Sequence, residues 1–218
     1  MQGCIQGKGK NIPSALRGTI GYLNAPKAHA IQAFGADVML SDDGDVMAVG
    51  ASNNGVIGDD PLGEQSDNFN SAGAVYIYQK QEGIWEYKAF LQAPNRGVRH
   101  YFGRDISLSG DGKVLAVGAW NENGQKNNPD ATGTPSGAVY IYRNLDDEWQ
   151  FEKYLKLSRI TGNDQFGNGL SLDQDGNTLA VAASYRQTSA GRTGTVHLIE
   201  YDNGEWEFTQ ELIPSTGN

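Results

Sequence analysis

The chain has 218 residues, with 17 basic and 26 acidic side chains and a formal net charge of −9. This acidic balance disfavours nucleic-acid binding, which needs basic patches that contact phosphate. No stretch approaches the roughly twenty apolar residues of a membrane-spanning helix, so we expect no membrane span. The 29 glycines and 7 prolines are typical of an all-β chain with many turns.

The N-terminal residues 1–15 are expected to form a flexible segment. They hold the only cysteine, Cys4, so no disulfide can form within the chain, and no signal peptide is visible because they lack an apolar core. Residues 16–33 are expected to hold an outer strand, from Leu16 to Leu23, and a connection. The reason is a recurring tetrapeptide: Leu23-Asn24-Ala25-Pro26 resembles Leu91-Gln92-Ala93-Pro94, and each begins 11 residues before a Phe-Gly pair.

From residue 34 onward the chain contains three copies of one sequence repeat, in residues 34–93, 94–157 and 158–218. Each copy contains a Phe-Gly pair, an Asp-Gly pair and two apolar segments. In the first copy these segments are Ala48-Val49-Gly50-Ala51 and Gly73-Ala74-Val75-Tyr76-Ile77-Tyr78. The Phe-Gly pairs begin at Phe34, Phe102 and Phe166, which are 68 and 64 residues apart. A long repeat of this kind predicts an array with one structural module per copy.

Each copy predicts four strands. In the first copy, Gly35 to Ser41 forms the first strand, and the following Asp-Gly pair supplies the positive φ of a tight hairpin. The second strand, Val46 to Ala51, is apolar at nearly every residue. The third strand, Ala74 to Tyr78, has large apolar side chains on both faces. Such patterns fit strands that are covered on both sides.

The fourth strand of the first copy begins near Trp85. Strict alternation would put Trp85, Tyr87, Ala89 and Leu91 on one face, with the charged residues between them on the other. A strand that is half polar and charged suits the outer edge of a sheet, where charge discourages pairing with other chains. The fourth strands of the other two copies carry the same pattern.

Four antiparallel strands, with the inner ones covered on both faces, describe the blade of a β-propeller. Neighbouring blades then cover each other's faces. A β-sandwich is the alternative, but it predicts evenly spaced strands with one wet face each. Closed propellers have roughly four to eight blades, so three blades predict an open, incomplete propeller or part of a larger ring. Further blades of the same chain, or a second copy of it, would complete such a ring.

The Phe-Gly, Gly-Ala and Gly-Ala-Val-Tyr-Ile-Tyr segments resemble FG-GAP repeats. Those repeats build the propeller of integrin α subunits and of many bacterial and algal surface proteins. The resemblance covers residues 34–213, which is nearly all of the chain. It implies a propeller fold, a role in adhesion or binding, and an extracellular or cell-surface location.

The loops that join the second and third strands share one face and are long and unequal. They run from Ser52 to Ala72, Trp120 to Ser136 and Ser184 to Thr193. Long loops on a rigid scaffold commonly carry function, and the resemblance implies that this face binds a protein or glycan ligand. The alternative is that the loops are only solvated and tolerant of change. The candidate ligand-binding residues are Asp59, Asp60, Glu64, Asp67, Phe69, Trp120, Asn121, Glu122, Asp130, Tyr185 and Arg186.

The Asp-Gly turns are the segments in which a calcium site would be expected. Many FG-GAP blades are similar to an EF-hand loop, with oxygen ligands at alternate positions before a glycine and an acid three residues after it. The position of that acid holds Met47, Leu115 and Leu179 here. We therefore predict plain hairpin turns with no metal and no cofactor, and weak calcium binding at Asp173 and Asp175 is the alternative.

The three histidines, His29, His100 and His197, give no catalytic signature. No Ser-His-Asp arrangement or His-Glu metal spacing is visible, and His197 replaces the tyrosine of the other copies, which indicates a packing role. Paired carboxylates such as Asp59-Asp60 occur without a pocket to assign them to. We therefore predict a non-catalytic binding, adhesion or scaffold module, not an enzyme. The alternative is a propeller-based hydrolase or lyase with an acidic active site on the loop face.

Overall fold

The computed structural model describes residue 26 and residues 32–56, 70–125 and 133–215. The N-terminal segment 1–15 and the strand expected from Leu16 to Leu23 lie outside these residues. The described part forms β-strands joined by turns and loops. It contains no helix long and apolar enough to cross a membrane.

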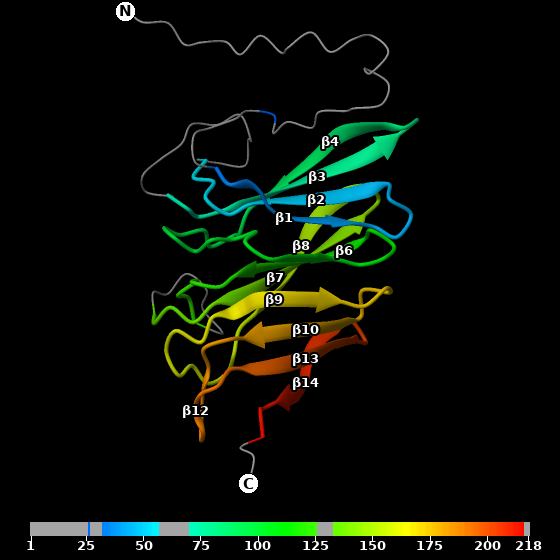
Figure 1. Ribbon diagram of the computed structural model, residues 1–218. Coiled ribbons are helices and arrows are strands. Elements are labelled where there is room, and N and C mark those ends of the chain that lie inside the picture. The colour runs from blue at the N-terminus through cyan, green and yellow to red at the C-terminus, as the bar shows by residue number, and fades with distance from the viewer. Residues whose placement is uncertain (1–25, 27–31, 57–69, 126–132, 216–218) are drawn as a thin grey trace, which may run out of the picture.

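Three four-stranded antiparallel sheets follow one another along the chain (Figure 1). Blade 1 consists of β1 (Phe34–Leu40), β2 (Val46–Ala51), β3 (Ala74–Gln81) and β4 (Ile84–Leu91). Blade 2 consists of β5 (Ile106–Leu108), β6 (Val114–Ala119), β7 (Ala138–Leu145) and β8 (Glu148–Leu155). Blade 3 consists of β9 (Phe166–Leu172), β10 (Thr178–Ala183), β13 (Thr195–Asp202) and β14 (Glu205–Leu212), and a short hairpin of β11 (Gln187–Thr188) and β12 (Gly191–Arg192) precedes β13.

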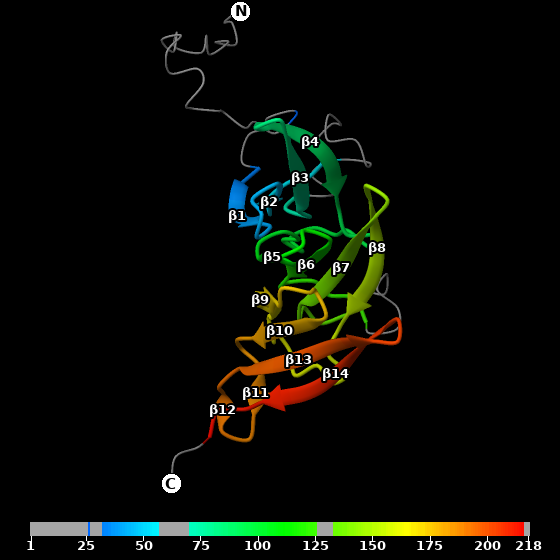
Figure 2. The same cartoon turned by 90° about the vertical axis from the view of Figure 1, so that its right-hand side faces the viewer.

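The strands lie in chain order within each blade, so the fourth strand is an edge strand, as predicted. The inner strands are covered on both faces: Val75, Tyr76, Ile77 and Tyr78 of β3 are each at most 1% exposed. Figure 2 shows β4, β8 and β14 along one side of the molecule, with β1, β5 and β9 toward the other.

The Asp-Gly segments form hairpin turns that side chains close. Gly44 has a φ of 72°, the left-handed conformation that a glycine adopts without strain. The Ser41 Oγ accepts a hydrogen bond from the Val46 N–H over 2.9 Å and donates one to the Asp43 carboxylate over 2.6 Å. The bond from Ser41 holds the pKa of Asp43 below its usual range. Ser109 and Asp111 repeat this arrangement in blade 2.

A β-bulge interrupts the fourth strand of every blade at the same place. In β4 it falls between the pair Ile77–Ala89 and the pair Tyr78–Tyr87, so Lys88 is the extra residue. The bulge reverses the alternation of side chains. The equivalent bulges lie at Glu152 in β8 and Thr209 in β14.

The predicted faces of the fourth strand are therefore wrong beyond the bulge. Trp85 packs with Tyr76 and Phe90 on one face of blade 1. Ala89 and Leu91 turn to the other face and join the core between blades 1 and 2. Neither a glycine nor a proline marks the bulge in β4, so strict alternation was the only pattern that its residues offered.

The second and third Phe-Gly pairs each dock on the preceding blade. The Phe102 N–H donates to the Ala72 carbonyl over 3.0 Å, and the Phe166 N–H donates to the Ser136 carbonyl over 2.8 Å. Isolated parallel bridges join Gly73 to Phe102 and Gly137 to Phe166. The same backbone contact thus ties blade 2 to blade 1 and blade 3 to blade 2.

Glycine is required where the blades approach most closely. A Cβ atom built on Gly50 would lie 2.1 Å from the Gly103 carbonyl oxygen, and one built on Gly118 would lie 2.1 Å from the Gly167 carbonyl oxygen. Real Cβ atoms do not come this close to a backbone atom, so a larger residue would force the blades apart.

The phenylalanine of each pair packs in the same way in all three blades. Phe34 and Phe102 each lie edge-on at 5.4 Å from a tyrosine, Tyr76 and Tyr140, and Phe166 lies 5.7 Å from His197. Phe102 and Phe166 are fully buried between blades. Phe34 is only half-buried, because no sheet precedes blade 1 in the described part of the chain.

The three blades form an open stack rather than a closed ring, as predicted. Blades 1 and 3 lie at opposite ends, each in contact with blade 2 (Figure 1). Val38 and Leu40 on the outer face of blade 1 are 48% and 52% exposed, whereas the equivalent Ile106 and Leu108 of blade 2 are buried. The stack therefore presents an uncovered apolar face at each end.

Candidate functional site

The structure describes five of the eleven predicted ligand-binding residues. The other six, Asp59, Asp60, Glu64, Asp67, Phe69 and Asp130, lie outside the described residues. Trp120 and Asn121 are partly exposed, and the Trp120 ring stacks on Tyr101 at 5.2 Å. The Asn121 side chain donates to the Arg99 carbonyl over 2.8 Å. Tyr185 is 50% exposed at the end of blade 3.

The loops after β2, β6 and β10 share one position with the same backbone hydrogen bonds in all three blades. It holds Asn54, Glu122 and Arg186, whose N–H groups bond to the carbonyl three residues earlier. Their carbonyls accept the N–H of Gly73, Gly137 and Gly194 over 2.8, 3.0 and 3.2 Å. The backbone is thus the same in all three blades, and the side chain decides what each loop can do.

In blade 2 this position is part of the core, which corrects the prediction for Glu122. The Glu122 and Lys156 side chains form an ion pair and are both fully buried. The carboxylate also accepts hydrogen bonds from Asn95 over 2.9 Å and from the Tyr154 hydroxyl over 3.0 Å. Burial lowers the pKa of Lys156, while the charge of Glu122 opposes that shift. Glu122 therefore has no access to a ligand.

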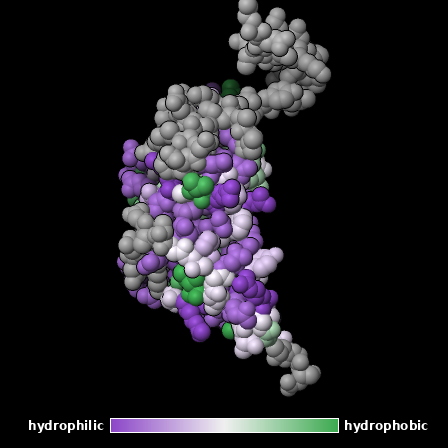
Figure 3. Space-filling view, turned by 90° about the vertical axis from the view of Figure 1, so that its left-hand side faces the viewer, coloured by the Kyte–Doolittle hydropathy of each residue, from purple (hydrophilic) through white to green (hydrophobic). Residues whose placement is uncertain are grey.

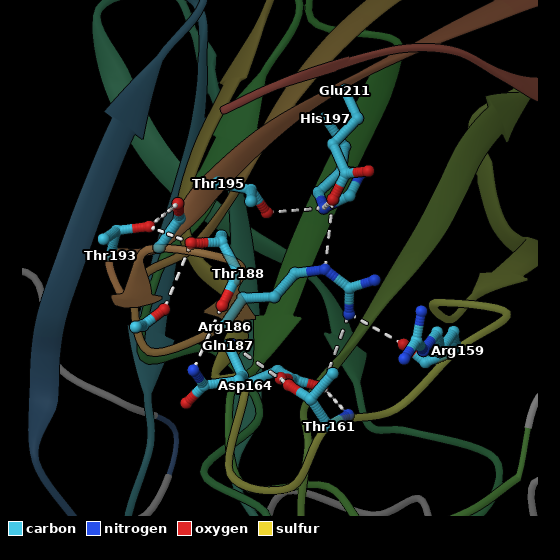
Figure 4. A network of polar contacts seen from close by, with 12 residues as sticks. Arg159, Thr161, Asp164, Arg186, Gln187, Thr188, Thr193, Thr195, His197 and Glu211 are labelled. Carbon is cyan, nitrogen blue, oxygen red and sulfur yellow. Dashed lines mark hydrogen bonds and ion pairs between the residues drawn. The ribbon is translucent and has the colours of Figure 1, made fainter. Parts of the chain in front are cut away.

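In blade 3 the same position carries Arg186, which lies at the centre of a polar network (Figure 4). Its Nε donates to the Glu211 carboxylate over 3.1 Å, and its Nη1 lies 3.6 Å from the buried Asp164 carboxylate. Nη1 also donates to the Arg159 carbonyl over 2.7 Å. The Arg186 side chain keeps 11% of its surface exposed, so the network reaches solvent.

His197 adjoins this network and has the packing role that the sequence predicts. Its ring lies edge-on to Phe166, where Tyr140 lies on Phe102 in blade 2. Nε2 lies 2.9 Å from the Thr195 hydroxyl and 3.7 Å from the Glu211 carboxylate. Burial lowers the pKa of His197, and Glu211 partly opposes this shift.

Protonation of His197 is expected to lower the free energy of unfolding. The folded pKa of His197 lies below the ordinary value of about 6.5, so its contribution is complete above that pH and is lost as the pH falls. We expect the free energy of unfolding to drop between pH 7 and 5. His197→Tyr, which restores the residue of the other blades, should make the drop smaller because tyrosine does not titrate in this range. Urea titrations of both proteins at each pH measure this.

His100 is expected to contribute to the same pH dependence, because burial lowers its pKa as well. Blade 1 has Gln32 at the equivalent position. His100→Gln should remove a separate part of the pH dependence, and the double variant should be the least sensitive to acid. Equal slopes for the wild type and all three variants would show that neither histidine contributes.

Two pockets flank Arg186, and both are lined by Arg186 and Glu211. The first has a volume of about 270 Å³ and is also lined by Ser158, His197 and Phe208. The second has a volume of about 450 Å³ and is also lined by Arg159, Thr161, Gln187, Thr188 and Ser189. Hydroxyl, amide, guanidinium and carboxylate groups thus converge on one end of blade 3, where they can bind a ligand with many hydroxyl groups.

Arg186 and Tyr185, both predicted from the sequence, lie at this end of blade 3, but Tyr185 lines neither pocket. Asp164, Glu211 and Arg159 are not predicted from the sequence. One signal was present for Asp164, which stands two residues before Phe166, as Gln32 and His100 stand before Phe34 and Phe102. In the described residues, no group of three or more His, Cys, Asp or Glu side chains could hold a metal ion.

Three stacked, four-stranded antiparallel sheets in an open array define an all-β protein of the propeller type. Residues 85–142 match the family model described as FG-GAP repeat. The predicted resemblance to FG-GAP repeats is thereby confirmed over these residues. A comparison with curated proteins found no match.

Several solved structures are similar at low identity. A proposed 6-phosphogluconolactonase from Bacteroides fragilis is 16% identical with a TM-score of 0.48, covering 81% of this chain and 38% of that one. A hypothetical selenium-binding protein from Sulfolobus tokodaii is 14% identical with a TM-score of 0.47, covering 79% and 39%. The periplasmic gluconolactonase PpgL from Pseudomonas aeruginosa is 14% identical with a TM-score of 0.40, covering 83% and 58%.

The chain spans about two fifths of the first two of these structures. The prediction that the chain is not an enzyme is contradicted by this comparison, because lactonases are among the similar structures. At 14–16% identity these structures identify no substrate and no catalytic residue in this chain.

Proposed function

We propose that the chain is a recognition module that binds a glycan in the two pockets around Arg186 of blade 3. The observation that carries this proposal is the convergence of paired donors and acceptors on both pockets. A sugar hydroxyl donates to a carboxylate such as Glu211 and accepts from a guanidinium such as Arg159. The side chains of Thr161, Gln187, Thr188 and Ser189 add groups that can do either.

Charge favours a glycan that carries carboxylates. The chain is acidic overall, with a net charge of −9, yet Arg159, Arg186 and Arg192 all lie at this end of blade 3. Asp164 and Glu211 already pair with Arg186. The Arg159 side chain is exposed at the rim of the larger pocket, where it is placed to bind an acidic sugar.

The surface supports a sugar rather than a protein as the ligand. A volume of about 450 Å³ suits a small ligand, whereas protein interfaces depend on buried aromatic and aliphatic anchors. The face shown in Figure 3 is mainly hydrophilic, with hydrophobic side chains in small separate groups. Residues 85–142 match the FG-GAP repeat model. Because the resemblance to these repeats implies an extracellular or cell-surface location, we propose that the binding takes place at a cell surface or in a secreted protein.

Calorimetric titration with neutral and uronate-containing oligosaccharides tests the proposal. We expect a uronate oligosaccharide to bind, and Arg159→Ala to weaken its affinity at least tenfold, about 1.4 kcal/mol. Arg104→Ala is the matched control, since Arg104 is an exposed arginine of blade 2. If no oligosaccharide binds, or if both variants bind like the wild type, the proposed site is wrong. Chromatography of the same mixtures will detect cleaved products.

A further inference from the structure

The open face of blade 3 repeats the docking surface of blades 1 and 2. There, Val75 and Val139 are fully buried under the next blade, and Leu91 and Leu155 are 6% and 3% exposed. The equivalent residues of blade 3, Val196 and Leu212, are 36% and 45% exposed. They line an apolar pocket of about 420 Å³ together with Ala182, Gly194 and Thr195. This pocket lies where the phenylalanine and glycine of another blade would dock.

The matching edge is present on blade 1. Gly35 has a φ of 85°, close to the 79° of Gly103 and the 87° of Gly167, which dock on the preceding blades. A Cβ on Gly35 would meet nothing within 4 Å. With the exposed Val38 and Leu40, the Phe34-Gly35 edge of a second copy has the features needed to dock on blade 3.

One residue breaks the correspondence. The carbonyl oxygen of the next Phe-Gly pair lies close to Gly50 in blade 1 and close to Gly118 in blade 2. A Cβ atom built on either glycine would lie 2.1 Å from that oxygen. The register of each blade puts Ala182 at this position: it pairs with Val196, as Gly50 pairs with Val75 and Gly118 with Val139. Blade 3 therefore has a methyl group where the docking carbonyl would lie, and a backbone atom cannot move aside cheaply.

We propose that Ala182 blocks self-association: its methyl group prevents the Phe34-Gly35 edge of a second copy from docking on blade 3. Head-to-tail contacts of one repeating kind extend into rings or filaments, and a methyl group at the contact point prevents this extension. The Ala182 methyl group prevents only the close backbone contact and leaves the apolar pocket in place. Its effect is similar to that of the charges and bulges that protect exposed β-strands from pairing with other chains.

Sedimentation velocity over a concentration series tests this proposal. The wild type should stay monomeric, and Ala182→Gly should associate, with at least a tenfold lower dissociation constant. Ala190→Gly is the matched control, because Ala190 is exposed in the β11–β12 turn. Adding Leu40→Glu to Ala182→Gly places a charge on the docking edge and should return the protein to a monomer. A monomeric Ala182→Gly variant, or a wild type that associates equally, would overturn the proposal.

A reciprocal variant keeps the test decisive if Ala182→Gly folds poorly. Gly118→Ala inserts the same methyl group at an existing interface and should loosen blade 3 from blade 2. Hydrogen exchange at the Phe166 amide, which bonds to Ser136 across that interface, should then become at least tenfold faster. Unchanged exchange would show that one methyl group does not block docking.

Discussion

Replacing Lys156 with methionine is expected to lower the free energy of unfolding by about 3–5 kcal/mol. The substitution leaves the fully buried Glu122 carboxylate without its cation. Hydrogen bonds from Asn95 and Tyr154 remain, but they do not neutralise a charge that has lost its solvent. Urea denaturation of both proteins at pH 7 measures the loss.

Blade 1 offers the control for this prediction. It has Asn54 at the position of Glu122 and Gln92 at the position of Lys156. An uncharged pair of side chains is therefore compatible with this backbone structure. The double variant Glu122→Asn and Lys156→Gln should be much more stable than Lys156→Met alone. If it is equally unstable, the loss comes from packing around Lys156 rather than from an unpaired charge.

Phe102→Ala is expected to cost roughly 3–5 kcal/mol, because the ring is fully buried between blades 1 and 2. Phe34→Ala removes the equivalent ring from blade 1, where it is only half-buried, and should cost roughly half as much. Thermal and urea unfolding of both variants compare the two positions directly. Equal losses would contradict the role of Phe102 as a plug between blades.

The blade architecture was predictable because the repeat is local. The Asp-Gly pairs mark the hairpins, and the continuous apolar segments mark strands that are covered on both faces. Gly50 and Gly118 recur at the same place in two copies, but only the structure shows the carbonyl oxygen that approaches each of them. The openness of the stack followed from counting three copies against the usual number of blades.

The candidate site was only partly predictable because its residues come from separate segments. Arg186 reaches Glu211, which lies 25 residues further on in the edge strand, and Asp164 in the connection to blade 3. Glu122 looked like a loop carboxylate, and its partner Lys156 lies 34 residues away. The bulge at Lys88 depends on how β3 and β4 pair, and no residue type in β4 predicts it.

A distance between the two ends of the stack tests the open array most directly. Spin labels at Val38→Cys and Val196→Cys, in a Cys4→Ser background diluted with unlabelled protein, mark the outer faces of blades 1 and 3. Packed sheets lie about 10 Å apart, so an open stack predicts a separation of at least roughly 20 Å. A closed ring would bring the two positions to roughly 10 Å, since the equivalent Val75 and Ile106 belong to one buried cluster between blades 1 and 2. A pulsed EPR distribution centred beyond roughly 20 Å is the expected result, and a dominant short distance within one molecule would contradict the open array.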